Sequence, residues 1–488
     1  MLKLNKKKLL NLLVPTALFL TAFLWKYINA GSRDICLDEP FTIFHAQDSL
    51  KNILLLPTQD EPNPPLFMII LHYWIKLFGN GPFSVRVIPI FFNALTTIFL
   101  YFAGKKFGGF WSGIIASGLF LFSTYHFFFG GETRAYSMLS CATAATLYFY
   151  LSVVKNPEKK INTIALIIAN LFLVYSHYFG WFIIFAQFLA GFLYLKDKRG
   201  IRNLLISFGV TGILYIPMAR ILIKQFISSS TKGTWLGPPA KSEYINQIKW
   251  FLNSERGFIT VIILIGLGIL VTLITKTKPA KWKEVVVMFM WWFVPYSIMF
   301  FISEKIPMFT NRYILFTTIG LYTFIGSVIY LLYQKTRLLL PIITILVCGI
   351  SFQKMETNNF AIREIKKSTD YTRTKFNSET LVLIFPQWAN LGFTYYYNPE
   401  LFNHIDNYYP LLRENKILPA WGLEDALSQI INIHHSRIIY FSNNAKTIDS
   451  SNSIFNYLDS AYFRTEEAQF KGGITVDVFD KIKEPDGK

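Results

Sequence analysis

Charged residues are scarce in this sequence. Asp, Glu, Lys and Arg make up 16% of its 488 residues, whereas a soluble domain carries about 25%. Long apolar runs account for the deficit, for example those at 83–104 and 203–223. Together with a mean hydropathy of +0.35, these runs exclude an ordinary soluble protein and predict a polytopic membrane protein.

Cysteine is also rare, and no internal repeat or low-complexity tract stands out. The three cysteines are Cys36, Cys141 and Cys348, which is too few for a disulfide framework. Cys141 and Cys348 fall inside predicted membrane spans, where a thiol is expected to pack as a small apolar group.

About eleven stretches are long and apolar enough to cross a bilayer, which takes roughly 20 residues. The first could imitate a signal peptide, but its run is long and lacks a small-residue cleavage site. We therefore interpret it as a retained span. The predicted spans lie near 9–28, 83–104, 110–129, 134–154, 161–176, 178–195, 203–223, 257–275, 284–302, 312–333 and 337–352.

Acidic residues are fewer than basic ones, 30 against 48, which gives a net charge of +18. With the N-terminus in the cytoplasm and alternating spans, the cytoplasmic segments hold 19 Lys or Arg and 3 acids, so 19 − 3 = +16. The positive-inside rule expects this asymmetry of short loops. The basic charge therefore indicates orientation, and no nucleic-acid partner is expected.

The segment after residue 352 differs from the rest, since it is nearly neutral. It contains strand-like runs at 380–386, 437–442 and 474–480, and a helical run at 423–435. The predicted fold is an α-helical polytopic membrane domain at 1–352, with a long first outer loop at 29–82. A small α/β extracytoplasmic domain at 353–488 follows it.

An acid pair, Asp38 and Glu39, stands in the first outer loop directly before Pro40. Proline is tolerated in a first helical turn, so a short helix is expected to begin here with one of the two acids at its N-cap. Backbone N–H groups and the helix dipole would favour the ionised carboxylate. Such a carboxylate can act as a general base, although a plain capping or solvated pair is the ordinary alternative.

The same loop continues through Glu61 and Asn63 into an apolar helix of about 15 residues after Pro64-Pro65. The helix is too short to span comfortably, and its aromatic residues suit a helix lying along the membrane surface. A juxtamembrane anchor is the simpler alternative.

Cationic and aromatic residues occur at the predicted outer ends of distant spans. They run against the positive-inside bias, and guanidinium groups at this depth suit a lipid-linked phosphate. The alternative for any one of them is snorkelling to headgroups. The residues are Arg86, Arg134 with the adjacent Glu132, Lys305, and Arg312 with Tyr313.

His177 occupies the tightest predicted outer turn, between the fifth and sixth spans. With His45, His72 and the loop acids it could contribute to a metal site, but no spacing matches a metal-ligand motif. A hydrogen-bonding histidine in a helical hairpin is the preferred interpretation. No metal ligand is predicted, and dependence on a divalent metal is left open.

Taken in order, these pieces resemble the polytopic GT-C glycosyltransferases. The similarity is closest to the bacterial branch related to protein O-mannosyltransferases and to the aminoarabinose transferase of lipid A. It covers residues 30–195 well, 284–333 loosely and the tail weakly. The matching pieces are "LDEPFT", "NPPLFMIILHYWIKLFG", "SVRVIPIFFNALTTIFLY", "ETRAYSML", "SHYFGWF" and "PMFTNRYILF".

The resemblance implies an inverting transfer of a sugar from a polyprenyl-phosphate donor to a lipid, protein or glycan acceptor on the extracytoplasmic face. Asp38 would be the base, and Glu39 would orient the acceptor or support the base. Arg134 would bind the donor phosphate, with Arg312 and Tyr313 beside it. Since the phosphate is itself the leaving group, no nucleotide or cofactor-borne step is implied.

This sequence departs from the family pattern at two places. Asn63 stands where relatives often have histidine, and Ala135-Tyr136 replaces a frequent Pro-Tyr, which is expected to affect only helix entry. The expected location is the bacterial inner membrane. A transporter or flippase of a lipid-linked precursor is the main alternative, but such proteins tend to show repeated halves and charges at mid-membrane.

Overall fold

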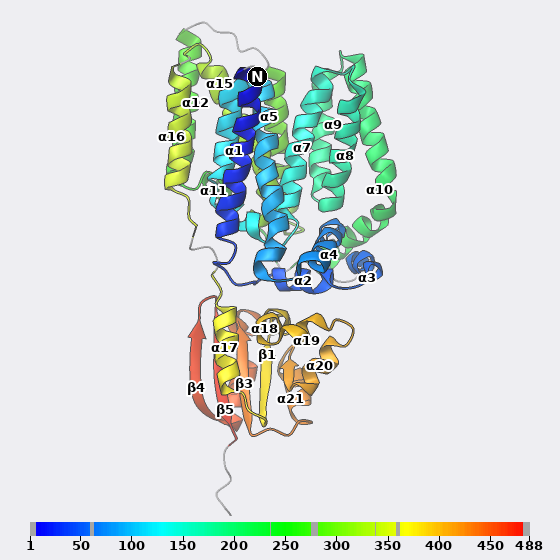
Figure 1. The fold of residues 1–488 in the computed structure, drawn as a ribbon, viewed down its shortest axis with the longest axis vertical. Helices are drawn as coiled ribbons and strands as arrows, with labels where there is room; N and C mark the ends of the chain where they lie inside the picture. Colours follow the sequence, from blue (N-terminus) through cyan, green and yellow to red (C-terminus); the bar gives the residue numbers. More distant parts are fainter. Residues whose placement is uncertain are drawn as a thin grey trace, which may run out of the picture. The chain divides into compact units, whose positions relative to one another are not determined.

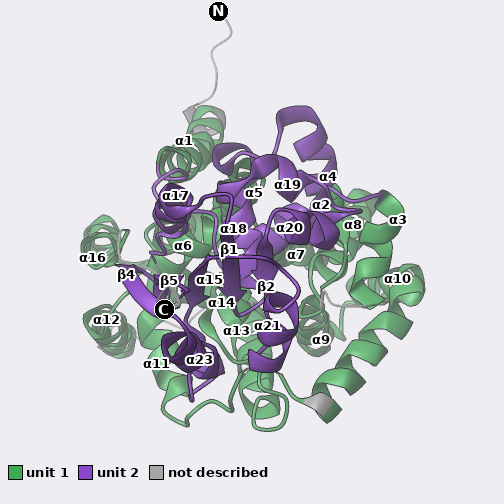
Figure 2. Cartoon of the chain, turned by 90° about the horizontal axis from the view of Figure 1, so that it is seen from below, with its two compact units in different colours: residues 1–28, 50–70, 86–357 green, residues 29–49, 71–85, 358–488 purple. Residues whose placement is uncertain are grey.

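The computed structural model describes residues 6–58, 63–234, 236–274, 282–336, 338–357 and 362–481. The chain divides into two compact units (Figure 2). Unit 1 comprises Met1–Ile28, Leu50–Ile70 and Arg86–Thr357, and unit 2 comprises Asn29–Ser49, Leu71–Val85 and Asn358–Lys488. Unit 2 thus joins two parts of the predicted first outer loop to the C-terminal segment. The domain division at residue 352 stays a prediction.

Unit 1 is helical, and its long helices run side by side (Figure 1). Short 3-10 turns follow several of them, at Leu56–Thr58 (η1), Phe129–Gly131 (η2), Phe192–Tyr194 (η3) and Leu315–Thr317 (η4). The α-helices are α1 (Lys6–Ile28), α3 (Leu50–Leu55), α5 (Pro82–Leu121), α6 (Thr124–Phe128), α7 (Tyr136–Lys155), α8 (Lys160–Ser176), α9 (Gly180–Gly191), α10 (Lys198–Lys232), α11 (Glu243–Phe251), α12 (Glu255–Ile274), α13 (Trp282–Ile302), α14 (Asn311–Ile314), α15 (Thr318–Tyr333) and α16 (Leu339–Gln353).

Seven helices within the described residues are long and apolar enough to cross a membrane. Four shorter apolar helices accompany them, at Leu66–Phe78 (α4), Lys160–Ser176, Gly180–Tyr194 and Leu339–Gln353. Within the described residues, helix covers most of each of the eleven predicted spans, which confirms the helical polytopic class. The number of crossings and the direction of the chain stay predictions.

Helix α5 carries the predicted span 83–104 and most of the predicted span 110–129 on one 40-residue element. Gly109 interrupts it with φ 75° and ψ −164°, values that a residue with a side chain rarely adopts. A Cβ on Gly113 would lie 2.5 Å from the Tyr101 carbonyl oxygen, and one on Gly104 would lie 2.9 Å from the Gly113 Cα. The two arms therefore fold back on one another as a close-packed hairpin, for which these glycines provide the space.

Unit 2 contains a five-stranded sheet with the order β2-β1-β3-β5-β4. Strand β1 pairs in parallel with β2 and β3, whereas β5 pairs antiparallel with β3 and β4. The strands are β1 (Thr380–Phe385), β2 (Ile417–Pro419), β3 (Arg437–Asn443), β4 (Phe463–Phe470) and β5 (Ile474–Asp480). The α-helices of unit 2 are α2 (Glu39–Ala46), α17 (Ile365–Lys375), α18 (Ala389–Tyr397), α19 (Pro399–Asn403), α20 (Tyr408–Glu414), α21 (Leu423–Ile430), α22 (Ala445–Ile448) and α23 (Ser453–Ala461).

The predicted α/β class of the C-terminal segment is confirmed. The three predicted strands are β1, β3 and β5, and the predicted helix at 423–435 contains α21. Every residue of β1 is buried, as expected for a strand inside a parallel sheet. The sequence did not predict β2, which has three residues, or β4.

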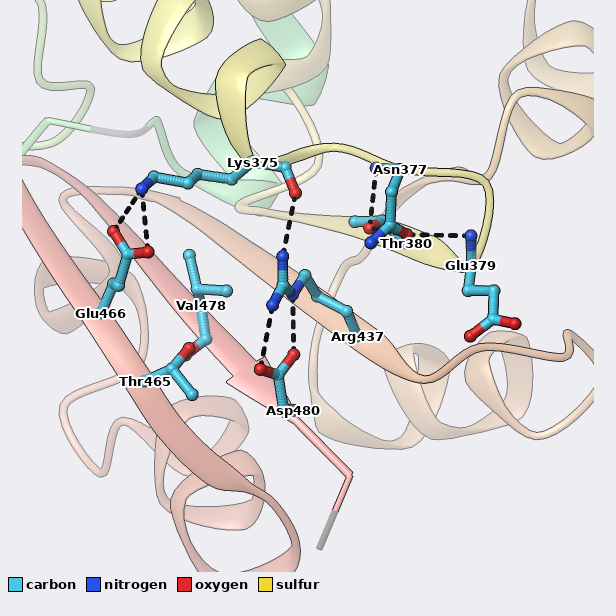
Figure 3. Close-up of polar contacts among 9 residues, drawn as sticks. All are labelled: Lys375, Asn377, Glu379, Thr380, Arg437, Thr465, Glu466, Val478 and Asp480. Atoms are coloured by element: carbon cyan, nitrogen blue, oxygen red, sulfur yellow. Dashed lines mark hydrogen bonds and ion pairs between the residues drawn. The ribbon is translucent and has the colours of Figure 1, made fainter. Parts of the chain in front are cut away.

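Ion pairs fasten one end of the sheet (Figure 3). The Arg437 Nε and Nη2 atoms donate to the Asp480 carboxylate at 2.7 and 3.0 Å, between directly opposed residues of β3 and β5. Lys375, at the end of α17, pairs with Glu466 of β4 at 2.6 Å. This ion pair therefore joins the end of α17 to the edge strand of the sheet.

Candidate functional site

The acid pair stands at the head of α2, as predicted. Helix α2 begins at Glu39, with Asp38 at its N-cap and Pro40 in the first turn. The predicted capping hydrogen bond is wrong, because the Asp38 side chain caps no N–H of α2. Asp38 has φ −87° and ψ −6°, an α-region backbone, whereas a capping residue has an extended backbone.

Burial separates the two acids. Glu39 is 1% exposed, and its Oε2 accepts the Cys36 N–H at 3.4 Å. Asp38 is half-buried. Directly before the pair, Leu37 has φ 57°, which is unusual for a residue with a side chain.

In unit 1, the turn before α7 brings Glu132 and Arg134 to the start of that helix. Residues Phe129–Gly131 form the 3-10 turn η2, and the Ser137 Oγ on α7 donates to the Gly130 carbonyl at 3.2 Å. Glu132 is 2% exposed, and Arg134 is half-buried. This turn therefore places one acidic and one cationic side chain directly before the start of α7.

Arg312 and Tyr313 lie on the short helix α14. The Arg312 guanidinium carbon is 5.3 Å from the Tyr313 ring centroid, a cation–π distance. Three further rings surround that of Tyr313, with centroids at 6.2 Å for Tyr136, 6.5 Å for His177 and 5.7 Å for Phe179. The structure therefore brings together the predicted Tyr313, Arg312 and His177 from distant parts of the sequence.

Tyr136 is a member of this cluster that the sequence reasoning missed. It is 3% exposed, and within the described part of the chain its hydroxyl has no hydrogen-bond partner. Arg134 and Arg312 both lie close enough to act electrostatically on that hydroxyl. A buried unpaired hydroxyl is costly, so it marks a position where a ligand oxygen would be stabilised. The feature of the sequence that could have identified Tyr136 is its position two residues after Arg134.

His177 lies in the turn between α8 and α9 and is 5% exposed. Burial and then the nearby charge of Arg134 lower the pKa of His177 to about 3. Its Nδ1 accepts the Phe179 N–H at 3.2 Å. The neutral imidazole therefore carries its proton on Nε2, where it is a hydrogen-bond donor, as the predicted hydrogen-bonding role requires.

The other predicted residues lie on other segments of the chain. Arg86 is fully buried in the first turns of α5, and Lys305 is exposed in the turn after α13. Asn63 is half-buried three residues before α4, and Glu61 lies outside the described residues. Their membership of the site stays a prediction.

A metal site receives no support from the residues described here. Among them, no group of three or more His, Cys, Asp or Glu side chains is placed to hold a metal ion. His72 instead contacts backbone, with its Nδ1 2.9 Å from the Ala46 carbonyl oxygen.

The unit 1 cluster combines two guanidinium groups, two phenol groups and a neutral imidazole. All of these are hydrogen-bond donors, and guanidinium groups match phosphate oxygens in a bidentate manner. The cluster is therefore suited to an anionic oxygen ligand. The acid pair of unit 2 is suited to accept a proton or to orient a hydroxyl or amine.

No protein-family model and no curated protein matches this sequence. Among solved structures, the chain is similar to ArnT from Cupriavidus metallidurans in the apo state. The TM-score is 0.60 at 11% sequence identity, over 95% of this chain and 97% of that chain. ArnT bound to undecaprenyl phosphate aligns with a TM-score of 0.57, at 11% identity and the same coverage.

The fold predicted from the sequence is thus confirmed. This chain shares the polytopic GT-C architecture of ArnT, together with a C-terminal α/β part.

Proposed function

We propose that this protein transfers a sugar, with inversion, from a polyprenyl-phosphate donor to an acceptor on the extracytoplasmic face of the membrane. The observation that carries the proposal is the cluster of Arg134, Arg312, Tyr313 and the unpaired hydroxyl of Tyr136. The fold shared with a structure that contains undecaprenyl phosphate supports the same donor class.

In this reaction the cluster stabilises the leaving phosphate. Negative charge grows on the bridging oxygen as the bond to the anomeric carbon breaks, and donors fixed beforehand stabilise that charge most. Arg134 and Arg312 neutralise the phosphate, while Tyr136 and Tyr313 donate from their hydroxyl groups. His177, held neutral, contributes an N–H without adding charge.

The acid pair acts on the acceptor. Asp38 accepts the proton of the acceptor hydroxyl or amine as the new bond forms on the face of the anomeric carbon opposite the phosphate. Glu39, buried and bonded to the Cys36 N–H, supports that carboxylate. One base and no covalent intermediate suffice for direct displacement with inversion.

The first test follows the donor in cells. Deletion of the protein should cause a polyprenyl-phosphate-linked sugar to accumulate, because nothing consumes it. The wild-type chain and Asp48→Asn, a control acid in the same loop, should remove the lipid, whereas Asp38→Asn should not. Removal of the lipid by Asp38→Asn, at equal expression and membrane insertion, would exclude Asp38 as the base.

A second test concerns the donor phosphate. Arg134→Ala should raise the apparent KM for the lipid donor by about 10- to 100-fold, since a hydrogen bond to a charged group contributes about 1.5–3 kcal/mol. The KM for the acceptor should change little. An unchanged donor KM would remove Arg134 from the phosphate site.

A further inference from the structure

The backbone directly before the acid pair has an unfavourable conformation. Leu37 has φ 57°, in the left-handed region where a Cβ crowds the following carbonyl oxygen. Such a conformation persists only when the surrounding structure holds it. The contacts on either side of Leu37 therefore determine where Asp38 lies.

Two hydrogen bonds join the chain before Leu37 to the C-terminal segment. The Ile35 N–H donates to the Tyr396 hydroxyl of α18 at 2.6 Å. The Lys366 N–H, in the first turn of α17, donates to Asp34 Oδ2 at 2.8 Å. Asp34 thus caps a helix of the C-terminal segment, and Tyr396 receives a backbone N–H three residues before Asp38.

Helix α2, after Leu37, packs on the same part of unit 2 (Figure 2). The Phe44 ring lies 5.5 Å from that of Phe402 and 4.8 Å from that of Tyr408. A Cβ on Gly392 of α18 would lie 3.7 Å from Pro40 Cγ, so α2 and α18 approach closely beside the acid pair.

Tyr396 is itself fixed by α17. The Arg373 Nη2 atom donates to the carbonyl oxygens of Tyr396 and Tyr397, each at 2.9 Å. Arg373 also pairs with Asp370 at 2.6 Å. One helix, α17, therefore both receives Asp34 at its start and orients the end of α18 that carries Tyr396.

We propose that the C-terminal α/β part of this protein positions the catalytic acid pair. Tyr396, and Asp34 through α17, hold residues 34–37 in the conformation that presents Asp38 to the acceptor. Both are positioning residues, and neither takes part in the chemistry. The inference rests on the proposed function, because it explains how the proposed base, Asp38, is held in position.

Tyr396→Phe removes only the hydroxyl that holds the Ile35 N–H. We expect kcat to fall about tenfold or more, since small misplacements of a catalytic group have large effects, while the donor KM stays unchanged. Tyr409→Phe is the matched control, because its hydroxyl accepts from Gln387 Nε2 at 2.6 Å and is exposed. A wild-type kcat for Tyr396→Phe would overturn the proposal.

Two substitutions of Asp34 test the same proposal, one conservative and one that removes the hydrogen-bond acceptor. Asp34→Asn retains an oxygen for the Lys366 N–H and should keep kcat within about twofold of wild type, whereas Asp34→Ala should lower kcat as Tyr396→Phe does. If Asp34→Asn abolished transfer, the carboxylate charge itself would be required and the positioning role would be wrong.

Hydrogen exchange separates this inference from the proposed function, because it needs no activity. In the full-length protein, Tyr396→Phe should speed exchange of the Ile35 amide about fivefold, as loss of one hydrogen bond predicts, and Tyr409→Phe should not. Unchanged exchange would show that Tyr396 does not hold this segment. A wild-type protein without transferase activity would instead refute the proposed function.

Discussion

At the residue scale, the acid pair and the cation cluster are the features that link this sequence to chemistry. Pro40 correctly predicted where α2 begins. The predicted cap was wrong, because Leu37 with φ 57° turns the chain so that Asp38 enters the helix with an α-region backbone. No local pattern indicates a left-handed leucine at this position, since that conformation depends on distant contacts.

Tyr136 provides a test that separates ligand binding from stability. Tyr136→Phe should raise the donor KM by about fivefold, the effect of one hydrogen bond, without lowering the melting temperature, because the hydroxyl has no partner in the described part of the chain.

Tyr322→Phe is the matched control for this measurement. Its buried hydroxyl donates to the Phe251 carbonyl at 2.6 Å, so its loss should lower the melting temperature. A lower melting temperature for Tyr136→Phe with unchanged donor KM would give Tyr136 a structural role only.

His177 predicts a specific dependence of stability on pH. Its folded pKa of about 3 lies below the unfolded value of 6.5, so the unfolded chain binds a proton first as the pH falls. The free energy of unfolding should therefore fall by about 2 kcal/mol between pH 7.5 and 5 through this group.

His177→Gln should remove that loss. Melting temperatures of the purified protein at pH 7.5 and 5 measure it, and the variant should show the smaller decrease. An equal decrease in both proteins would mean that His177 is not held neutral by its surroundings.

At the element scale, the sequence predicted the helices well because span length and apolar composition are local properties. Helix covers most of each of the eleven apolar stretches in the described part of the chain. Strand β4, with the sequence "FRTEEAQF", was missed because its alternation is hidden by charged residues, which are frequent on edge strands. Strand β2 was missed because three residues are too few to show a period.

The α5 hairpin makes a prediction about packing. Gly113→Ala should lower the melting temperature, because its Cβ would lie 2.5 Å from the Tyr101 carbonyl oxygen. Overpacking of this kind costs about 1–3 kcal/mol.

Gly349→Ala, on α16, is the control, since a Cβ there meets no atom within 4 Å. Equal melting temperatures for the two variants would show that the arms of α5 are not in close contact at Gly113.

At the scale of the whole molecule, the sequence correctly predicted the polytopic fold and the appended α/β segment. It could not predict that residues 29–49 and 71–85 join the C-terminal segment in one compact unit. That association depends on contacts such as Asp34 with Lys366, 332 positions apart, and no local pattern encodes them. The candidate base therefore belongs to unit 2 and the candidate phosphate cluster to unit 1.

The most direct test of the central claim uses the lipid that accumulates in deletion cells. It should be incubated with purified wild-type protein and acceptor membranes, and both released polyprenyl phosphate and the sugar product should be measured. We predict equal amounts of the two, inversion at the anomeric carbon, and neither product with Asp38→Asn. A lipid that crosses the membrane with its sugar–phosphate bond intact would contradict the account and indicate a flippase.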